Sequence, residues 1–339
     1  MRSGVMVVAV AVMLSAMAIT ACSPDGTREE SGAQQWDASA PVEEASVPQS
    51  VNANLRQPAS TQDSAYDAAR QHLLSALSGG SSRERLAALM LQGGVPGAQS
   101  AEVLVGLLLA DGGRDPLVAT QALNACASWE ACPREQVLAL TAGLATDDAR
   151  LQLLRLAISE PGAHEALWEA AAQAPAYVDP MRLHWAALLE ATEPLATTAA
   201  RDHRRAVEGL AVASAVAMPD LTTMKNRCPV ATEVDDHVLQ CRQLALLMAE
   251  SSNMLTASVG LLFLRRQALS PAQAEPWNQL YRQLRWQAQL AAPLMDAEVA
   301  YPRQMARLGE REAIIWLLRQ RGLPLSPPPH WQPGQPTGY

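Results

Sequence analysis

The sequence predicts an all-α protein, and three observations support this fold class. Hydrophobic residues make up 49% of the 339 residues, which suffices for a sizeable core and excludes global disorder. Aromatic residues make up only 4%, with a single Phe, so the core must consist mainly of Leu, Ala, Val and Met, of which all but Val favour helices. Apolar residues recur at helical spacing, as in Val137, Leu140 and Leu144, which disfavours a β-sandwich or barrel.

Glycine and proline divide the region from residue 64 to residue 321 into segments of helical length. Breaks are expected at Gly79-Gly80, Gly93-Gly94, Gly112-Gly113, Pro161-Gly162, Pro175, Pro194, Pro219, Pro271 and Pro293. After about residue 194 the helices become longer, and they are expected over residues 195–218, 234–251, 253–269, 272–291 and 296–321. The last of these helices is expected to be split or kinked near Tyr301-Pro302.

Four helix-start signals recur at an even spacing. They lie at Ser81, Asp115, Asp147 and Asp179, so a new start follows every 32 to 34 residues. Ser81 and Glu84 form a capping-box pattern, and Asp115 and Asp179 each precede a Pro that suits the first position of a helix. The interval between two consecutive starts is long enough for two helices. Such a repeat of helix pairs is typical of an α-solenoid of antiparallel helix pairs.

The period resembles that of tetratricopeptide repeats, and the resemblance implies a superhelix of that kind. The Trp, Gly, Tyr and Ala consensus of that family is missing, so the resemblance concerns the architecture and not the family. An irregular helical bundle with evenly spaced loops is the alternative. We expect a repeat region over residues 64–193, a C-terminal helical region over 194–321 that continues it, and a Pro-rich tail over 322–339, which Trp331 pins to the body and which is otherwise loosely held.

The first 22 residues carry the pattern of an export signal. Arg2 provides a positive start, and residues 5–18 form an apolar stretch shorter than the ~20 residues of a spanning helix. The following Ile19-Thr20-Ala21-Cys22 resembles the lipobox of bacterial lipoproteins. The resemblance implies removal of a signal peptide over residues 1–21 and lipidation of Cys22. An ordinary secretory signal that contains a cysteine is the alternative.

A lipoprotein signal also implies a location. Asp after the lipidated cysteine tends to retain lipoproteins in the inner membrane, whereas this chain has Ser23, which is consistent with an outer-membrane lipoprotein that faces the periplasm. Residues 22–63 are expected to form a disordered tether, because they lack an apolar period and hold seven acidic residues against Arg28 and Arg56. As a random coil this tether spans about 35 Å.

Four cysteines remain once Cys22 is assigned to the lipid. An even number of cysteines in an exported chain indicates disulfides, and four cysteines allow three pairings. Cys126 and Cys132 flank one expected turn, and Cys228 and Cys241 flank another, so we expect these two local pairs. A zinc or thioredoxin-type site is disfavoured, because neither pair is a C-x-x-C and no His lies at ligand spacing.

The C-terminal third differs in charge from the rest of the folded region. Residues 265–321 carry nine Arg and five acidic residues, interleaved with Trp and Tyr, whereas residues 64–264 are acidic. Arg303, Arg307 and Arg311 recur every four residues, so on one helix they would form a stripe for an anionic partner. The alternative is that the aromatic residues belong to the core and the arginines to ordinary solvated faces.

No recognised motif for catalysis, cofactor binding or metal binding is found in the sequence. It contains no H-E-x-x-H, G-x-S-x-G, Walker or dinucleotide-binding pattern, so we assign no catalytic residue, cofactor or metal ligand. The net charge of −8 disfavours a nucleic-acid binder. We therefore expect a membrane-anchored envelope lipoprotein that acts as a non-enzymatic interaction or scaffold module with a protein partner. The alternative is an envelope enzyme or enzyme accessory, for example one acting on the cell wall.

Overall fold

The computed structural model describes residues 61–92, 98–216, 222–295, 298 and 300–335. The chain divides into two compact units, residues 1–64 and 65–339, and the description below concerns the second. The expected signal peptide, Cys22 and the tether up to residue 60 lie outside the described residues, as do the expected breaks at Gly93-Gly94 and Pro219.

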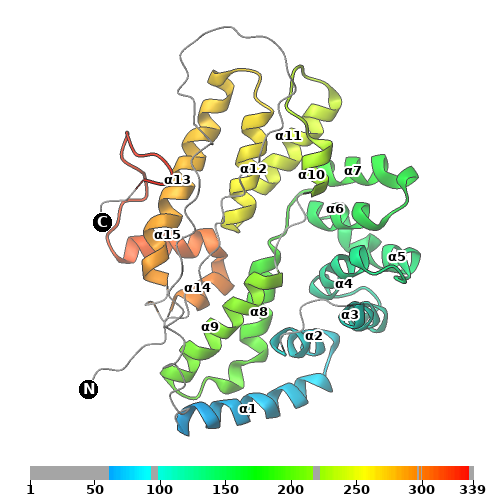
Figure 1. Cartoon of the computed structure of the whole chain (residues 1–339), viewed down its shortest axis with the longest axis vertical. Coiled ribbons are helices and arrows are strands. Elements are labelled where there is room, and N and C mark those ends of the chain that lie inside the picture. The colour runs from blue at the N-terminus through cyan, green and yellow to red at the C-terminus, as the bar shows by residue number, and fades with distance from the viewer. Residues whose placement is uncertain (1–60, 93–97, 217–221, 296–297, 299, 336–339) are drawn as a thin grey trace, which may run out of the picture. The chain divides into compact units, whose positions relative to one another are not determined.

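The described part of the chain is all-helical, with fifteen α-helices, two 3-10 turns and no strand, which confirms the predicted fold class. Figure 1 labels the helices. Up to residue 195 they are α1 (Thr61–Ser78), α2 (Ser82–Leu91), α3 (Ala98–Asp111), α4 (Pro116–Ser128), α5 (Arg134–Ala145), α6 (Ala149–Ile158), η1 (Pro161–Ala163), α7 (His164–Gln173), α8 (Pro180–Ala191) and η2 (Glu193–Leu195).

The expected helix starts are confirmed, and the third is placed one residue later than predicted. Ser81 forms a complete capping box with Glu84 at the start of α2. Asp115, Asp148 and Asp179 cap α4, α6 and α8 by accepting backbone N–H bonds in the first turn.

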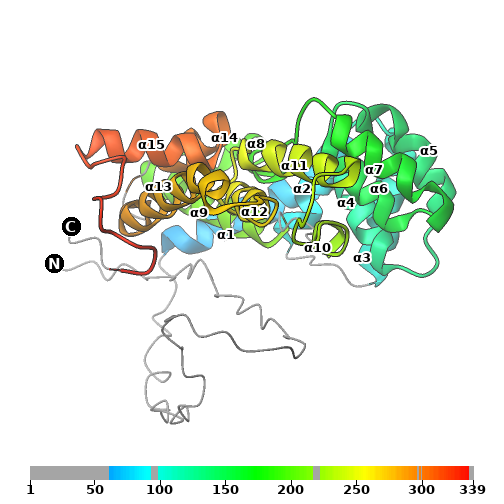
Figure 2. The ribbon, with the colours of Figure 1, turned by 90° about the horizontal axis from the view of Figure 1, so that it is seen from above.

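The second half contains α9 (Ala199–Val216), α10 (Thr222–Arg227), α11 (Asp236–Ala249), α12 (Met254–Arg266), α13 (Pro271–Met295), α14 (Tyr301–Leu308) and α15 (Glu310–Gln320). Figure 2 shows α11, α12 and α13 beside one another. The break expected at Pro293 comes two residues later, because α13 includes Pro293 in its last turn and ends at Met295. The helix expected over residues 296–321 is two helices, separated at Gly309, whose φ of 86° favours glycine.

The proline-rich tail is held on the body more extensively than the sequence predicts. After α15 the chain turns at Gly322, and Figure 1 and Figure 2 both show the tail beside α13. Trp331 is 5% exposed and packs edge-on against Trp286 of α13, with ring centroids 5.2 Å apart. The expectation of a loosely held tail is therefore wrong for residues 322–335.

Helices that follow one another in the chain pack together, as in α3 with α4, α6 with α7, α8 with α9 and α11 with α12. Contacts between distant helices are also present. Helix α8 packs against α2, α4 and α14, and α7 packs against α11. The C-terminal helices therefore return to the first half instead of only extending it, whereas in a simple solenoid each repeat contacts only its neighbours.

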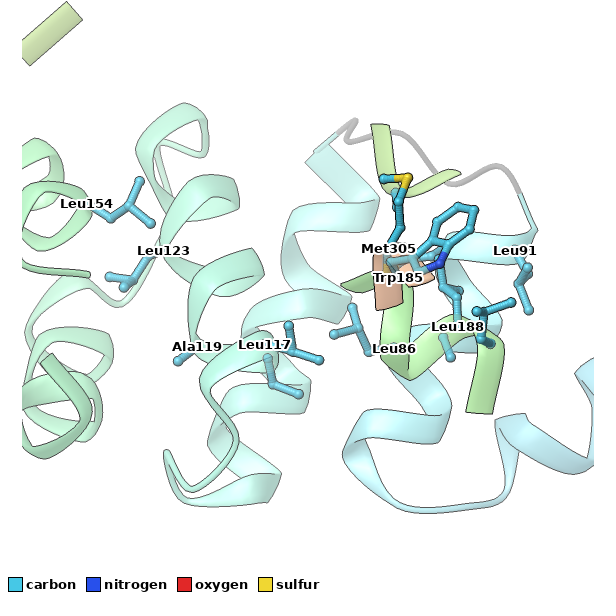
Figure 3. Close-up of a cluster of buried hydrophobic side chains, with 14 of the residues drawn as sticks. Leu86, Leu91, Leu117, Ala119, Leu123, Leu154, Trp185, Leu188 and Met305 are labelled. Atoms are coloured by element: carbon cyan, nitrogen blue, oxygen red, sulfur yellow. The ribbon is translucent and has the colours of Figure 1, made fainter. Parts of the chain in front are cut away.

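Two hydrophobic clusters form the core, and α6 contributes to both. Its Leu151, Leu154 and Ile158 face the larger cluster, whereas Leu153 and Leu156 face the smaller one. Helix α6 is therefore apolar on two faces, as expected for a central helix. Figure 3 shows the larger cluster around α8, with its labelled residues from five helices: Leu86, Leu91, Leu117, Ala119, Leu123, Leu154, Trp185, Leu188 and Met305.

The four cysteines form the two expected local pairs. Cys126 near the end of α4 is bonded to Cys132 before α5, with a Cα–Cα distance of 5.3 Å. Cys228 after α10 is bonded to Cys241 in α11, with a Cα–Cα distance of 5.7 Å. Each disulfide therefore closes a turn between consecutive helices.

Candidate functional site

An open groove of about 420 Å³ lies where four elements meet. Helix α8, η2, α9 and α14 line it through Ala186, Leu189, Glu190, Glu193, Arg205, Arg303, Ala306 and Arg307. Two of the three arginines expected to contact an anionic partner, Arg303 and Arg307, therefore lie at this groove. We call it the α8–α14 groove.

Packing of α14 on α8 positions the two arginines. Pro302 at the start of α14 accepts a hydrogen bond from the buried Trp185 of α8, with an Nε1–O distance of 2.6 Å. Tyr301 and Met305 are buried on the packed side of α14. Arg303 and Arg307 are one helical turn apart, so both contribute to the lining of the groove.

A buried arginine forms the base of the groove. The Arg205 side chain is only 1% exposed, and its guanidinium donates to Glu193 at 2.5 Å and to Asp202 at 2.6 Å. It also donates to the carbonyl of Leu189 at 2.8 Å. Since charged side chains are rarely buried without partners, these contacts hold η2, α9 and α8 in a fixed arrangement.

Asp202 extends this network to the rim of the groove. Its second carboxylate oxygen accepts a hydrogen bond from Arg303 at 2.6 Å, and the Arg303 side chain is 60% exposed. Arg307 donates to the neutral side chain of Gln304 at 2.9 Å. Glu190 and Glu193 also line the groove, so it combines both signs of charge with the apolar Ala186, Leu189 and Ala306 and is not a purely cationic surface.

The third arginine of the expected stripe does not share a helix with the other two. Gly309 ends α14 before Arg311, which lies in the first turn of α15. The backbone N–H of Arg311 donates to the Ser252 carbonyl at 2.8 Å, and its side chain lies near the Ala249 carbonyl. The prediction of one continuous helical stripe is therefore wrong, because a glycine with positive φ redirects the chain.

The aromatic residues interleaved with the arginines belong mainly to the core, as the alternative held. Trp286 and Tyr301 are buried, and Trp277, Tyr281 and Trp316 are partly buried and pack against the two clusters. The aromatic rings therefore stabilise the helices that carry the arginines, and they do not line the groove.

A second polar group lies in the interior, between α4, α6 and α8. The Nε2 atom of the buried His184 lies 2.8 Å from the Gln121 amide nitrogen, and Arg150 donates to the Thr120 hydroxyl at 3.2 Å. Burial and the nearby Arg150 charge lower the pKa of His184 to about 3, so its imidazole is neutral at physiological pH. The adjoining cavity holds only about 10 Å³, about one water molecule, so this group does not form a substrate site.

Glu310, at the start of α15, has a carboxyl group whose pKa is raised. Its carboxylate accepts the Met254 backbone N–H at 2.8 Å, which joins α15 to α12. Desolvation and the negative charge of Asp179 raise its pKa to about 7, against the stabilising effect of the Met254 N–H. The Ser252 hydroxyl donates to Asp179, so these groups connect α8, α12 and α15.

Six lining residues of the groove were not found from the sequence: Ala186, Leu189, Glu190, Glu193, Arg205 and Ala306. Asp202, which joins Arg205 to Arg303, was also not assigned to a site. The spacing of Asp202 and Arg205, three residues apart on one helix, was the only local signal available. Among the residues described, no three His, Cys, Asp or Glu side chains converge as a metal site requires. No described helix is both long enough and apolar enough to cross a bilayer.

The fold and the groove together define an all-helical protein with an open surface site of mixed charge. No family model, no curated protein and no solved structure matches the chain.

Proposed function

We propose that the protein is a membrane-anchored envelope lipoprotein that acts as a non-enzymatic interaction module, and that the α8–α14 groove binds a segment of a protein partner. One observation carries this proposal. The groove places the exposed Arg303 and Arg307 beside the apolar Ala186, Leu189 and Ala306, above the buried Arg205 network. Such a combination of arginine and apolar surface is enriched at protein interfaces.

The lining of the groove defines the chemistry of the partner. Arg307 donates only to a neutral glutamine in the described structure, so it is available for a carboxylate of the partner. Leu189, Ala186 and Ala306 suit a small apolar side chain beside that carboxylate. The rim glutamates Glu190 and Glu193 disfavour a highly acidic partner, since like charges repel.

The helix pairs before the groove form the scaffold in this proposal. The capped starts at Ser81, Asp115, Asp148 and Asp179 recur along the first half of the chain, which supports a short tetratricopeptide-like array of antiparallel pairs. Helix α8 ends this array and lines the groove, so the array supports one wall of the binding site.

The membrane anchor rests on the lipobox-like pattern that ends at Cys22. Lipid chains contribute about 0.8 kcal/mol for each buried methylene, so multiple acyl chains hold a protein firmly at a bilayer. Cys22→Ala should therefore release the protein into the soluble envelope fraction or leave the signal peptide uncleaved. Normal cleavage with unchanged membrane fractionation of this variant would rule out lipidation of Cys22 as the anchor.

The groove is tested by capture of partners from detergent-solubilised envelope. Arg303→Gln/Arg307→Gln should lower capture and its dependence on salt, because exposed charges are screened within a Debye length of about 8 Å at physiological salt. Arg201→Gln is a matched control, because Arg201 lies on α9, hydrogen bonds to Thr197 and does not line the groove. Equal capture by all three proteins at every salt concentration would place the interaction surface elsewhere.

A further inference from the structure

The charges that line the α8–α14 groove are sorted onto opposite walls. Glu190 and Glu193 belong to the wall that α8 and η2 form. Arg303 and Arg307 belong to α14, which packs against α8 and forms the other wall. The groove therefore has an acidic side and a basic side, and it favours a ligand whose own charges are separated in the same way.

Pairing within the protein leaves one charge of each sign available in the groove. The buried Arg205 and the rim residue Arg303 both have carboxylate partners. Arg307 and Glu190 are exposed, and neither forms an ion pair with another described residue. The α14 wall thus offers an arginine to a ligand, and the α8 wall offers a carboxylate.

The packing of α14 on α8 limits the length of a ligand segment that contacts both charges. The axes of packed helices lie about 8–10 Å apart. Two residues of an extended chain span about 7 Å, and side chains two positions apart point to the same side of that chain. A carboxylate and a basic side chain separated by about two residues can therefore contact Arg307 and Glu190 together.

A free C-terminus provides the required groups in the shortest segment. Its carboxylate and its last side chain leave from the same Cα, so the carboxylate can meet Arg307 while a small apolar side chain packs on Leu189 and Ala306. An internal Asp or Glu uses its own side chain for the carboxylate. The side chains next to it in an extended chain point to the opposite face, away from the groove.

We propose that the α8–α14 groove is specific for the C-terminus of the partner protein. The partner ends in a small apolar residue and has Lys or Arg two positions before its end. Arg307 binds the terminal carboxylate, and Glu190 selects the basic side chain. This inference rests on the proposed function, because it names the segment of the partner that the same groove binds.

The two groove residues have separable roles. Hydrogen bonds between arginine and a carboxylate are among the strong ones in proteins, so Arg307 should provide most of the recognition of the chain end. Ion pairs between exposed side chains contribute little to affinity, so Glu190 should act mainly on the choice of sequence.

The experiment uses the full-length protein, purified in detergent and immobilised, and two pools of N-acetylated octapeptides of random sequence. One pool ends in free carboxylates and the other in amides, and the retained peptides are sequenced. Peptides with a free carboxylate should be recovered at least about tenfold over the amides. The recovered peptides should be enriched in a small apolar last residue and in Lys or Arg two positions before it.

Variants of the two groove residues should change these preferences one at a time. Arg307→Gln should remove the preference for the free carboxylate, whereas Glu190→Gln should remove only the preference for a basic residue. Arg201→Gln and Glu169→Gln are the matched controls, because both residues lie outside the groove. Both controls should keep the two preferences.

Three results would overturn the inference: no retained peptide, equal recovery from the two pools, or a preference for the free carboxylate that survives Arg307→Gln. An unblocked tripeptide that competes better than the octapeptides would identify a small zwitterionic peptide as the ligand and would overturn the choice of a protein C-terminus.

Failure of the proposed function gives a different result. Arg303→Gln/Arg307→Gln would then capture the same envelope proteins as the wild-type protein at every salt concentration. Reduced capture by this variant, together with equal recovery from the two peptide pools, would show that an internal segment of the partner binds the groove. That outcome would overturn only the inference of a C-terminus.

Discussion

At the scale of single residues, Glu310 gives a pH dependence with a defined sign. Its pKa is about 7 in the folded protein, against an ordinary value of 4.5. Below pH 4.5 the Glu310 carboxyl is protonated in both the folded and the unfolded state, so its burial does not lower the folding stability. Between pH 4.5 and about 7 the unfolded state has lost this proton while the folded state keeps it, so folding stability decreases as the pH rises, and the cost is complete above about pH 7.

Glu310→Gln removes this cost and keeps an oxygen that can accept the Met254 N–H. The variant should therefore exceed wild type in free energy of unfolding by up to about 3 kcal/mol at pH 8, at about 1.4 kcal/mol per pKa unit, and by little at pH 5. Urea unfolding at both pH values measures this difference. Glu312→Gln, on the exposed side of the same helix, is the control. A difference that is the same at both pH values would exclude the assigned titration.

Arg205 is the residue on which the groove depends for its arrangement. Arg205→Met removes the buried hydrogen bonds to Glu193, Asp202 and the Leu189 carbonyl, so unfolding should become easier by about 1–3 kcal/mol. Arg201→Met, which loses one exposed hydrogen bond to Thr197, should cost less than about 1 kcal/mol. Thermal or urea unfolding separates the two variants. Equal small effects would show that Arg205 does not join η2 to α9.

At the scale of helices, the recurring caps connect neighbouring elements as well as starting helices. The Asp148 carboxylate accepts a hydrogen bond from the Arg150 N–H at 2.9 Å, in the first turn of α6. It also accepts one from the Val178 N–H at 3.1 Å, just before α8. Asp115 likewise accepts a bond from Arg83 of α2 at 2.5 Å. Asp148 and Asp115 therefore each tie a helix start to an adjacent segment.

Asp148 and its exposed neighbour Asp147 form a matched pair for testing these caps. Asp148→Ala should lower the free energy of unfolding by about 2–3 kcal/mol, because it removes a cap and leaves the Val178 N–H without an acceptor. Asp148→Asn keeps an acceptor and should lose less, and Asp147→Ala should lose under about 0.5 kcal/mol. If Asp147→Ala costs as much as Asp148→Ala, the cap is assigned to the wrong residue.

The helix starts could be predicted because capping is local. Ser81, Asp115 and Asp179 were recognised from residues within one turn of each start, and the third start was one residue out because Asp147 and Asp148 are adjacent acids. The break at Gly309 was missed, since a glycine within a helical pattern is compatible with either outcome. The need for glycine at position 309 also comes from a tertiary contact, because an added Cβ there would lie 2.3 Å from the Cβ of Ser252.

At the scale of the whole folded unit, the contacts between helices that are distant in the sequence could not be predicted from the spacing of apolar and capping residues. No local sequence signal indicates that α14 packs on α8. This packing depends on the hydrogen bond from the Trp185 indole to the Pro302 carbonyl, and the two residues are 117 positions apart in the sequence. The groove arises from that contact, so only the arginines of α14 could be predicted as site residues. The disulfides were predictable because each closes a short turn.

Binding of a protein partner in the α8–α14 groove, as proposed above, can be tested in intact cells. The most direct measurement is photo-cross-linking in intact cells, with a photoreactive amino acid replacing Glu190 at the rim of the groove. The control position is Glu169, which is exposed on α7 and does not line the groove. We expect a discrete adduct from position 190 that is absent from position 169 and is lost in the Arg303→Gln/Arg307→Gln background. No adduct from position 190, or the same adducts from both positions regardless of the arginines, would contradict it.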